Sequence, residues 1–255
     1  GPVSATSTIT PRFCRDTVAV SVPPVGIASR AFSPRFTITW CNWFGSAVNE
    51  VLRLVEGDNG FFLICHDDVA LEPRVVRTLV AEVFRSNAGI VGPKLTDWDQ
   101  PRLLQHVGLG LDRFGELDPL VEPGEVDQEQ HDAVRDVFVL PSACLLVRAD
   151  LFRSLGGFDP AISFYGDDVD LCWRAHLTGA RVVIAPDARV RHRERLGERR
   201  PDLHHQTLRS RHRMRTVATL TGGSRLVGRS VQLALLTIVE LLVGLFTGRF
   251  GEALA

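Results

Sequence analysis

Two acidic clusters have residue types that could hold a cation or move a proton. The first, Asp67-Asp68, comes directly after the apolar run 61–65 and His66. Five apolar residues in a row, rich in bulky and β-branched types, are typical of a strand buried on both faces, as in a parallel sheet. Open α/β sheets bind ligands at the carboxyl ends of such strands. The expected partner of the pair is therefore a divalent metal that carries a phosphorylated ligand.

The second cluster, Asp167-Asp168 with Asp170 close behind, opens a segment of helical length. The helix dipole favours carboxylates in a first turn, which is one explanation of this cluster. Three carboxylates within four residues also repel one another, which is typical of a cation site or of proton transfer. The first pair has a simpler alternative too, namely capping of a helix that starts near Pro73.

The elements that would position these clusters alternate between strand and helix. Residues 75–84 place apolar side chains at helical spacing, and residues 90–92 follow as an apolar strand. Residues 61–92 thus form a strand–helix–strand unit, which implies a parallel sheet with a right-handed crossover. The apolar segments 137–147 and 181–185 add further strands. We expect an α/β fold with a mostly parallel sheet.

The composition narrows the function classes. A net charge of −1 over 255 residues gives no overall pull toward nucleic acid or membrane. Five scattered cysteines without a CxxC motif favour a reduced, cytosolic setting over a disulfide framework. Residues 1–30 lack the pattern of a signal peptide. Residues 94–135 predict a hairpin followed by a mobile, solvated acidic loop.

The C-terminal part combines a basic stretch with an apolar one. Residues 189–215 contain ten Arg against three acids, which indicates either a solvated basic face or an anionic partner. The interleaved aromatic residues expected for nucleic-acid binding are missing, so we exclude a nucleic-acid partner. Residues 231–247 are almost wholly apolar around Glu240. They predict a helix in the membrane interface or in a helix bundle, with a packed core helix as the alternative.

The order of these motifs resembles the glycosyltransferase family 2 enzymes with the GT-A fold, especially rhamnosyltransferase-like and galactofuranosyltransferase-like members. Within the matching region, residues 156–192 are the most specific, because they join GGFD, DDVDLCWR and a terminal His in the family's order. The resemblance implies a Rossmann-like GT-A sheet, in a larger membrane-associated bacterial protein. It divides the chain into a divergent or truncated N-terminal part of the sheet (1–45), a catalytic core (46–195) and a basic segment with an apolar membrane-associated helix (196–255).

The resemblance also implies a metal and donor site. His66-Asp67-Asp68 stands at the place of the family's DxD motif. Asp68 would bind Mn²⁺ or Mg²⁺ that bridges the diphosphate of a nucleotide-sugar, and Asp67 and His66 would contact the donor. His192 matches a histidine that completes the metal site in galactofuranosyltransferase-like members.

The second acidic cluster takes the catalytic role in this resemblance. Asp167-Asp168 matches the family's acidic pair, in which Asp168 would be the general base that deprotonates the acceptor hydroxyl. Arg174 would hold the leaving diphosphate, or would simply pair with Asp170. A single base without a second nucleophile implies one displacement, with inversion at C1 of the sugar.

The implied function is a metal-dependent, inverting glycosyltransferase at the cytoplasmic face of the cell membrane. It would move a sugar from a UDP- or dTDP-sugar to a hydroxyl of a cell-envelope glycan or lipid-linked acceptor. The alternative is a catalytically impaired GT-A-like domain that serves as a membrane-associated scaffold or binding module, because residues 1–45 lack the family's nucleotide-binding motif. A nucleotidyltransferase is disfavoured, since the chain has no Gly-rich, basic phosphate loop near its start.

Overall fold

The structure, a computed structural model, describes residues 17–22, 36–38, 44–55, 57–112, 114–162, 164–194, 204–223 and 227–228. The chain divides into two compact units, residues 1–213 and residues 214–255. The apolar segment 231–247 lies outside the described residues, as does most of segment 1–45. No helix in the described ranges is both long enough and apolar enough to cross a membrane.

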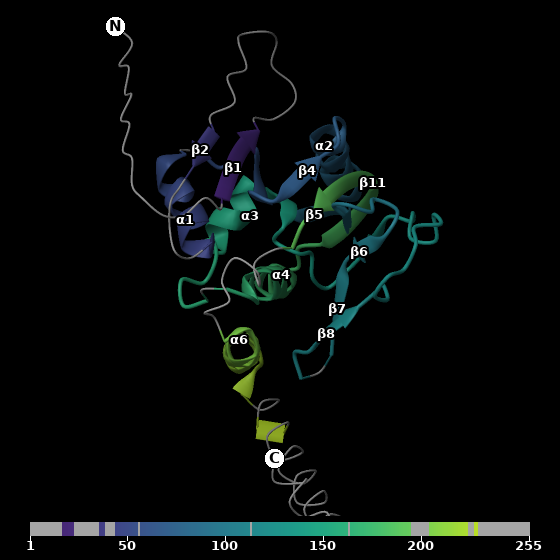
Figure 1. The fold of residues 1–255 in the computed structure, drawn as a ribbon. Helices are drawn as coiled ribbons and strands as arrows, with labels where there is room; N and C mark the ends of the chain where they lie inside the picture. Colours follow the sequence, from purple (N-terminus) through teal and green to yellow (C-terminus); the bar gives the residue numbers. More distant parts are fainter. Residues whose placement is uncertain are drawn as a thin grey trace, which may run out of the picture. The chain divides into compact units, whose positions relative to one another are not determined.

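A mixed sheet of nine strands forms the centre of the first unit (Figure 1). Its strands are β1 (Thr17–Val22), β2 (Phe36–Ile38), β3 (Phe61–His66), β4 (Val69–Leu71), β5 (Ile90–Asp97), β6 (Leu104–His106), β9 (Arg135–Asp136), β10 (Cys144–Arg148) and β11 (Val182–His192). Along the main path the order is β2-β1-β3-β10-β5-β11-β4. A separate hairpin pairs β7 (Leu109–Leu111) with β8 (Leu117–Pro119).

The α/β class is as predicted, with a sheet that is mixed in strand direction. Strands β5 and β11 are parallel neighbours. Strand β10 lies antiparallel between β3 and β5, so β3, β5 and β11 all run in one direction. The predicted strand–helix–strand unit is therefore present, but its two strands are not adjacent. The strand between them, β10, belongs to a segment much later in the chain, and local periodicity does not reveal such an insertion.

Helices cover both faces of the sheet (Figure 1). The described helices are α1 (Phe44–Leu54), α2 (Val75–Ser86), α3 (Ala149–Ser154), α4 (Asp167–Leu177) and α6 (His205–Leu220). Alternate residues of β3 serve the two faces, as strand geometry requires. Phe62 and Ile64 pack with buried residues of α1, α3 and α4, whereas Phe61, Leu63 and Cys65 pack with those of α2. The prediction of a strand buried on both faces is confirmed.

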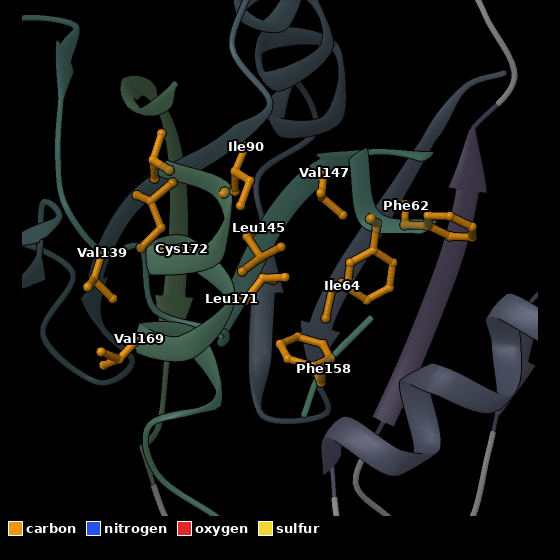
Figure 2. Packing of buried hydrophobic residues seen from close by; sticks show 14 of the residues in the cluster. Phe62, Ile64, Ile90, Val139, Leu145, Val147, Phe158, Val169, Leu171 and Cys172 are labelled. Atoms are coloured by element: carbon orange, nitrogen blue, oxygen red, sulfur yellow. The ribbon is translucent and has the colours of Figure 1, made fainter. Parts of the chain in front are cut away.

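The apolar side of α4 fixes that helix to the sheet. Leu171 and Cys172 are fully buried and belong to one cluster with Ile64 of β3 and Leu145 of β10 (Figure 2). Burying side chains of this size stabilises the fold by roughly 1.5–3 kcal/mol each. The packing therefore holds the first turn of α4, with its acidic residues, at a fixed place against the sheet.

A buried lysine corrects the prediction of a mobile acidic loop. Lys94 of β5 has no exposed side-chain surface, and its Nζ lies 3.0 Å from Asp127 Oδ1. The same Nζ bonds Asp132, and Arg189 Nη1 lies 3.1 Å from Asp127 Oδ2. Two cations on neighbouring strands thus tie the end of the acidic stretch 116–132 to the sheet.

Replacing Lys94 by Met is expected to lower the free energy of unfolding by about 3 kcal/mol, because Asp127 would stay buried with half of its counter-charge gone. Urea denaturation measures this change. The matched control is Arg102→Met on an exposed residue, which should change stability by about 0.5 kcal/mol or less. Equal effects of the two variants would show that the buried ion cluster does not stabilise the loop.

Candidate active site

Three ligand-type side chains meet at the ends of β3 and β11. His66 ends β3, Asp68 lies in the turn between β3 and β4, and His192 ends β11. Antiparallel pairing of β4 with β11 sets His192 opposite Val69, and the Arg193 backbone N–H donates to the Asp68 carbonyl at 3.1 Å. Ligand atoms of His66, Asp68 and His192 all lie within 4.8 Å of one another. Sequence positions more than a hundred residues apart thus converge.

The donor set fits a divalent cation. The His192 Nε2 atom lies 3.4 Å from Asp68 Oδ1, and both side chains are buried. The other ring nitrogen, His192 Nδ1, is buried without a hydrogen-bond partner among the described residues, although buried polar atoms are normally paired. Gln105 Nε2 donates to the His192 carbonyl at 2.9 Å and fixes its backbone. Two imidazoles and a carboxylate form a mixed nitrogen and oxygen ligand set.

The structure also tests whether the first acidic pair, Asp67-Asp68, caps the helix that follows it. Helix α2 begins at Val75, and its N-cap residue Arg74 makes no side-chain capping bond. Asp67 and Asp68 form the tight turn between β3 and β4, with Asp67 exposed and Asp68 buried. The explanation of the pair as helix caps is therefore wrong.

The second acidic pair opens α4, as predicted. Asp167 is buried and Asp168 half-buried in the first turn of the helix. Burial, then the charge of Asp168, raises the pKa of Asp167 to about 7, against a hydrogen bond from the Ser142 side chain. Burial also raises the pKa of Asp168, against hydrogen bonds from the Val169 and Ser142 backbones. Carboxyl groups with raised pKa values are suited to accept a proton near neutral pH.

Ser142 joins the two clusters, and sequence reasoning missed it. Its Oγ lies 3.5 Å from His66 Nε2, while the residue also hydrogen-bonds Asp167 and Asp168. Ser142 thus lies between the acidic pair and His66. Among the described residues, the candidate metal ligands are His66, Asp68 and His192, and the acidic pair is not among them. The Pro141-Ser142 break in an apolar segment was the available signal.

Asp170 and Arg174 form a separate contact on α4. Arg174 Nε donates to Asp170 Oδ2 at 2.7 Å, and Arg174 Nη1 donates to the Leu155 carbonyl at 2.8 Å. The geometry corresponds to the second of the two alternatives for Arg174, pairing with Asp170. The pair ties α4 to the end of α3.

The raised pKa of Asp167 predicts a pH-dependent stability. Its folded value of about 7 lies above the ordinary 3.8, so its stabilising contribution is complete below about pH 4 and is lost as pH rises through about 7. Without divalent cations, Asp167→Asn should therefore gain stability relative to the wild type between pH 5 and pH 8, on the order of 1.4 kcal/mol per pH unit until the group ionises. Urea denaturation at both pH values measures this difference. Parallel pH profiles of the two proteins would contradict the prediction.

Comparison with known proteins identifies the family of the chain. A family model described as "Glycosyltransferase like family 2" matches residues 42–219. The O-antigen biosynthesis protein RfbC of Myxococcus xanthus is 28% identical over 168 residues, which cover 64% of this chain. The N-acetylglucosaminyl-diphospho-decaprenol L-rhamnosyltransferase of Mycobacterium tuberculosis is 29% identical over 171 residues, or 58% of this chain.

These relatives are longer than the matched region. The alignments cover 13% of RfbC and 55% of the rhamnosyltransferase. A crystal structure of GalNAc-T7 with UDP, GalNAc and Mn²⁺ aligns with a TM-score of 0.47 at 12% identity, over 61% of this chain and 31% of that chain. The α/β fold class and the family that the sequence motifs implied are confirmed. Because the family model matches more than half of the chain, the chain belongs to the glycosyltransferase-like family 2.

Proposed function

We propose that the protein is a metal-dependent, inverting glycosyltransferase. The observation that carries the proposal is the placement of a His-Asp-His ligand group near the acidic pair Asp167-Asp168, with Ser142 in contact with both. Family membership supports a transferase. The ligand group and the acidic pair would meet the two chemical requirements of glycosyl transfer. The departing diphosphate needs its charge stabilised, and the attacking hydroxyl needs its proton removed.

His66, Asp68 and His192 would hold the cation. A mixed set of imidazole and carboxylate suits Mn²⁺ better than Mg²⁺, which prefers oxygen ligands. When bound, the cation supplies Lewis-acid stabilisation of the charge that develops on the leaving diphosphate. Asp67, exposed in the same turn, would contact the donor sugar or ribose.

Asp168 is the proposed general base. It is more exposed than Asp167, so an acceptor hydroxyl can reach it, and backbone N–H groups of Val169 and Ser142 orient its carboxylate. Its raised pKa increases its proton affinity, so that it takes the proton as the hydroxyl attacks. Asp167 lies deeper, and its burial and the charge of Asp168 raise its pKa to about 7, which opposes the build-up of two negative charges side by side. One base implies a single displacement and inversion at C1.

The substrates are proposed from the names of the relatives and from charge. One relative is named for O-antigen biosynthesis and another for a diphospho-decaprenol substrate. We infer a UDP- or dTDP-sugar donor and a lipid-linked or cell-envelope glycan acceptor, used at the cytoplasmic face of the membrane. The basic segment beyond residue 195 supports contact with an anionic lipid or diphosphate.

The test is incubation of the full chain with Mn²⁺, a polyprenyl-diphosphate-linked acceptor and a panel of UDP-, dTDP- and GDP-sugars. Release of nucleoside diphosphate together with a glycosylated acceptor supports the proposal, provided that Asp68→Ala abolishes both. Calorimetric measurement of the binding of the same nucleotide-sugars tests the alternative, a catalytically impaired scaffold. If the folded protein binds none of them, the result contradicts the transferase proposal and supports the scaffold alternative.

A further inference from the structure

One face of helix α6 is directed at the segment that precedes the acidic pair. His205, Arg209 and His212 follow the spacing i, i+4, i+7, which places their side chains on one side of a helix. His205 Nδ1 lies 2.7 Å from the Tyr165 hydroxyl. The Arg209 guanidinium lies 4.6 Å from the centre of the Tyr165 ring, and His212 contacts the backbone of Phe164 and Tyr165.

The His212 contact is a two-acceptor hydrogen bond in a buried place. Nδ1 lies 2.7 Å from the Phe164 carbonyl oxygen and 2.9 Å from the Tyr165 carbonyl oxygen. Because both partners are acceptors, Nδ1 must carry the hydrogen. His212 is only 2% exposed, so the loss of its side chain would remove a buried donor from both carbonyls.

The backbone that His212 holds is strained. Tyr165 has a φ of 61° and Gly166 a φ of 92°, so two consecutive residues adopt the left-handed region. A bulky residue such as Tyr adopts this region only where its surroundings enforce it. The next residue is Asp167, and α4 begins there without a side-chain cap. The conformation of residues 164–166 therefore sets where the acidic pair starts.

We infer that His212 is a positioning residue for Asp168: by holding the carbonyls of Phe164 and Tyr165, it fixes the strained turn that aims the general base. The inference rests on the proposed function and adds a role for α6. Part of the basic stretch 189–215, which the sequence left as either a solvated face or a site for an anionic partner, binds the chain's own backbone. Arg209, on the same helix face, also acts on Asp168: its positive charge lowers the pKa of Asp168, whereas burial raises it.

The experiment compares His212→Ala, His212→Asn and the control Gln206→Ala, an exposed and uncharged residue on the same helix. Asn carries its side-chain N–H₂ on the Cγ atom, as His carries Nδ1, so it can donate to the same carbonyls. His212→Ala is expected to lower kcat about 10- to 100-fold with the donor KM within about twofold, since a small misplacement of the base affects chemistry more than binding. His212→Asn should recover most of kcat, and Gln206→Ala should match the wild type.

Hydrogen exchange decides the inference independently of activity. Backbone amides of residues 165–169 should exchange at least about 10-fold faster in His212→Ala than in the wild type, and near the wild-type rate in His212→Asn. Unchanged exchange, or a kcat of His212→Ala equal to that of Gln206→Ala, would overturn the positioning role. If the wild type transfers no sugar at all, the proposed function fails, while the exchange rates still show whether His212 holds the turn. If His212→Ala does not fold, the recovery in His212→Asn decides, and an Asn variant as slow as an Asp168→Asn enzyme would overturn the inference.

Discussion

Asp168→Asn is expected to lower kcat by about 10²- to 10⁴-fold while leaving the donor KM nearly unchanged, because Asn keeps the shape of the side chain and loses its proton affinity. The half-buried carboxylate at the start of α4 has its pKa raised by burial and its orientation fixed by the Ser142 and Val169 backbones. Steady-state kinetics with a coupled assay for nucleoside diphosphate measure both parameters.

Asp170→Asn is the matched control, because Asp170 lies in the same first turn but is bound to Arg174. We expect this variant to lose stability, since Arg174 loses its partner, and to keep kcat within about 10-fold of the wild type. Similar losses of kcat in the two variants would mean that the first turn of α4 matters for structure alone. The role of Asp168 as base would then be wrong.

Asp68→Asn is expected to reduce kcat/KM by about 10³-fold or more at a fixed Mn²⁺ concentration, because a charged ligand is replaced by a neutral one. A removed ligand weakens metal binding, so raising the Mn²⁺ concentration should recover part of the activity. Isothermal titration with Mn²⁺ alone provides the second readout. The affinity should fall in Asp68→Asn and in His192→Ala, and it should persist in Asp187→Asn, which alters an exposed carboxylate of β11.

Mn²⁺ affinity that is the same in all these variants would contradict the ligand assignment. Chelation with EDTA distinguishes a second case. A wild-type enzyme that keeps full activity in EDTA does not depend on a cation, whatever the geometry of its histidines. The His66-Asp68-His192 group would then serve another purpose.

Local sequence pattern was sufficient for the elements that carry the site. The unbroken apolar run 61–65 predicted a strand buried on both faces, since side chains alternate along a strand and every position was apolar. The acidic first turn and helical length predicted α4. His192 entered through the family motif, and the structure explains its place, because β4 and β11 pair across the turn that holds Asp68.

The pairing of strands that are far apart in the chain could not be predicted from the sequence. Nothing in segment 137–147 indicates that its strand inserts between β3 and β5, because strand neighbours far apart in the chain leave no local periodicity. Ser142 and His212 were missed for the same reason, since each acts through contacts with distant residues. Lys94 did leave a signal that the prediction of a mobile loop did not use, because a cation that directly follows an apolar strand needs a counter-charge if it is buried.

Anomalous diffraction from crystals grown with Mn²⁺ and a nucleoside diphosphate tests the central claim most directly. We expect one manganese peak within about 2.5 Å of a ligand atom from each of His66, Asp68 and His192, with the diphosphate beside it. A manganese peak elsewhere, or a bound diphosphate with no manganese near these three residues, would contradict it.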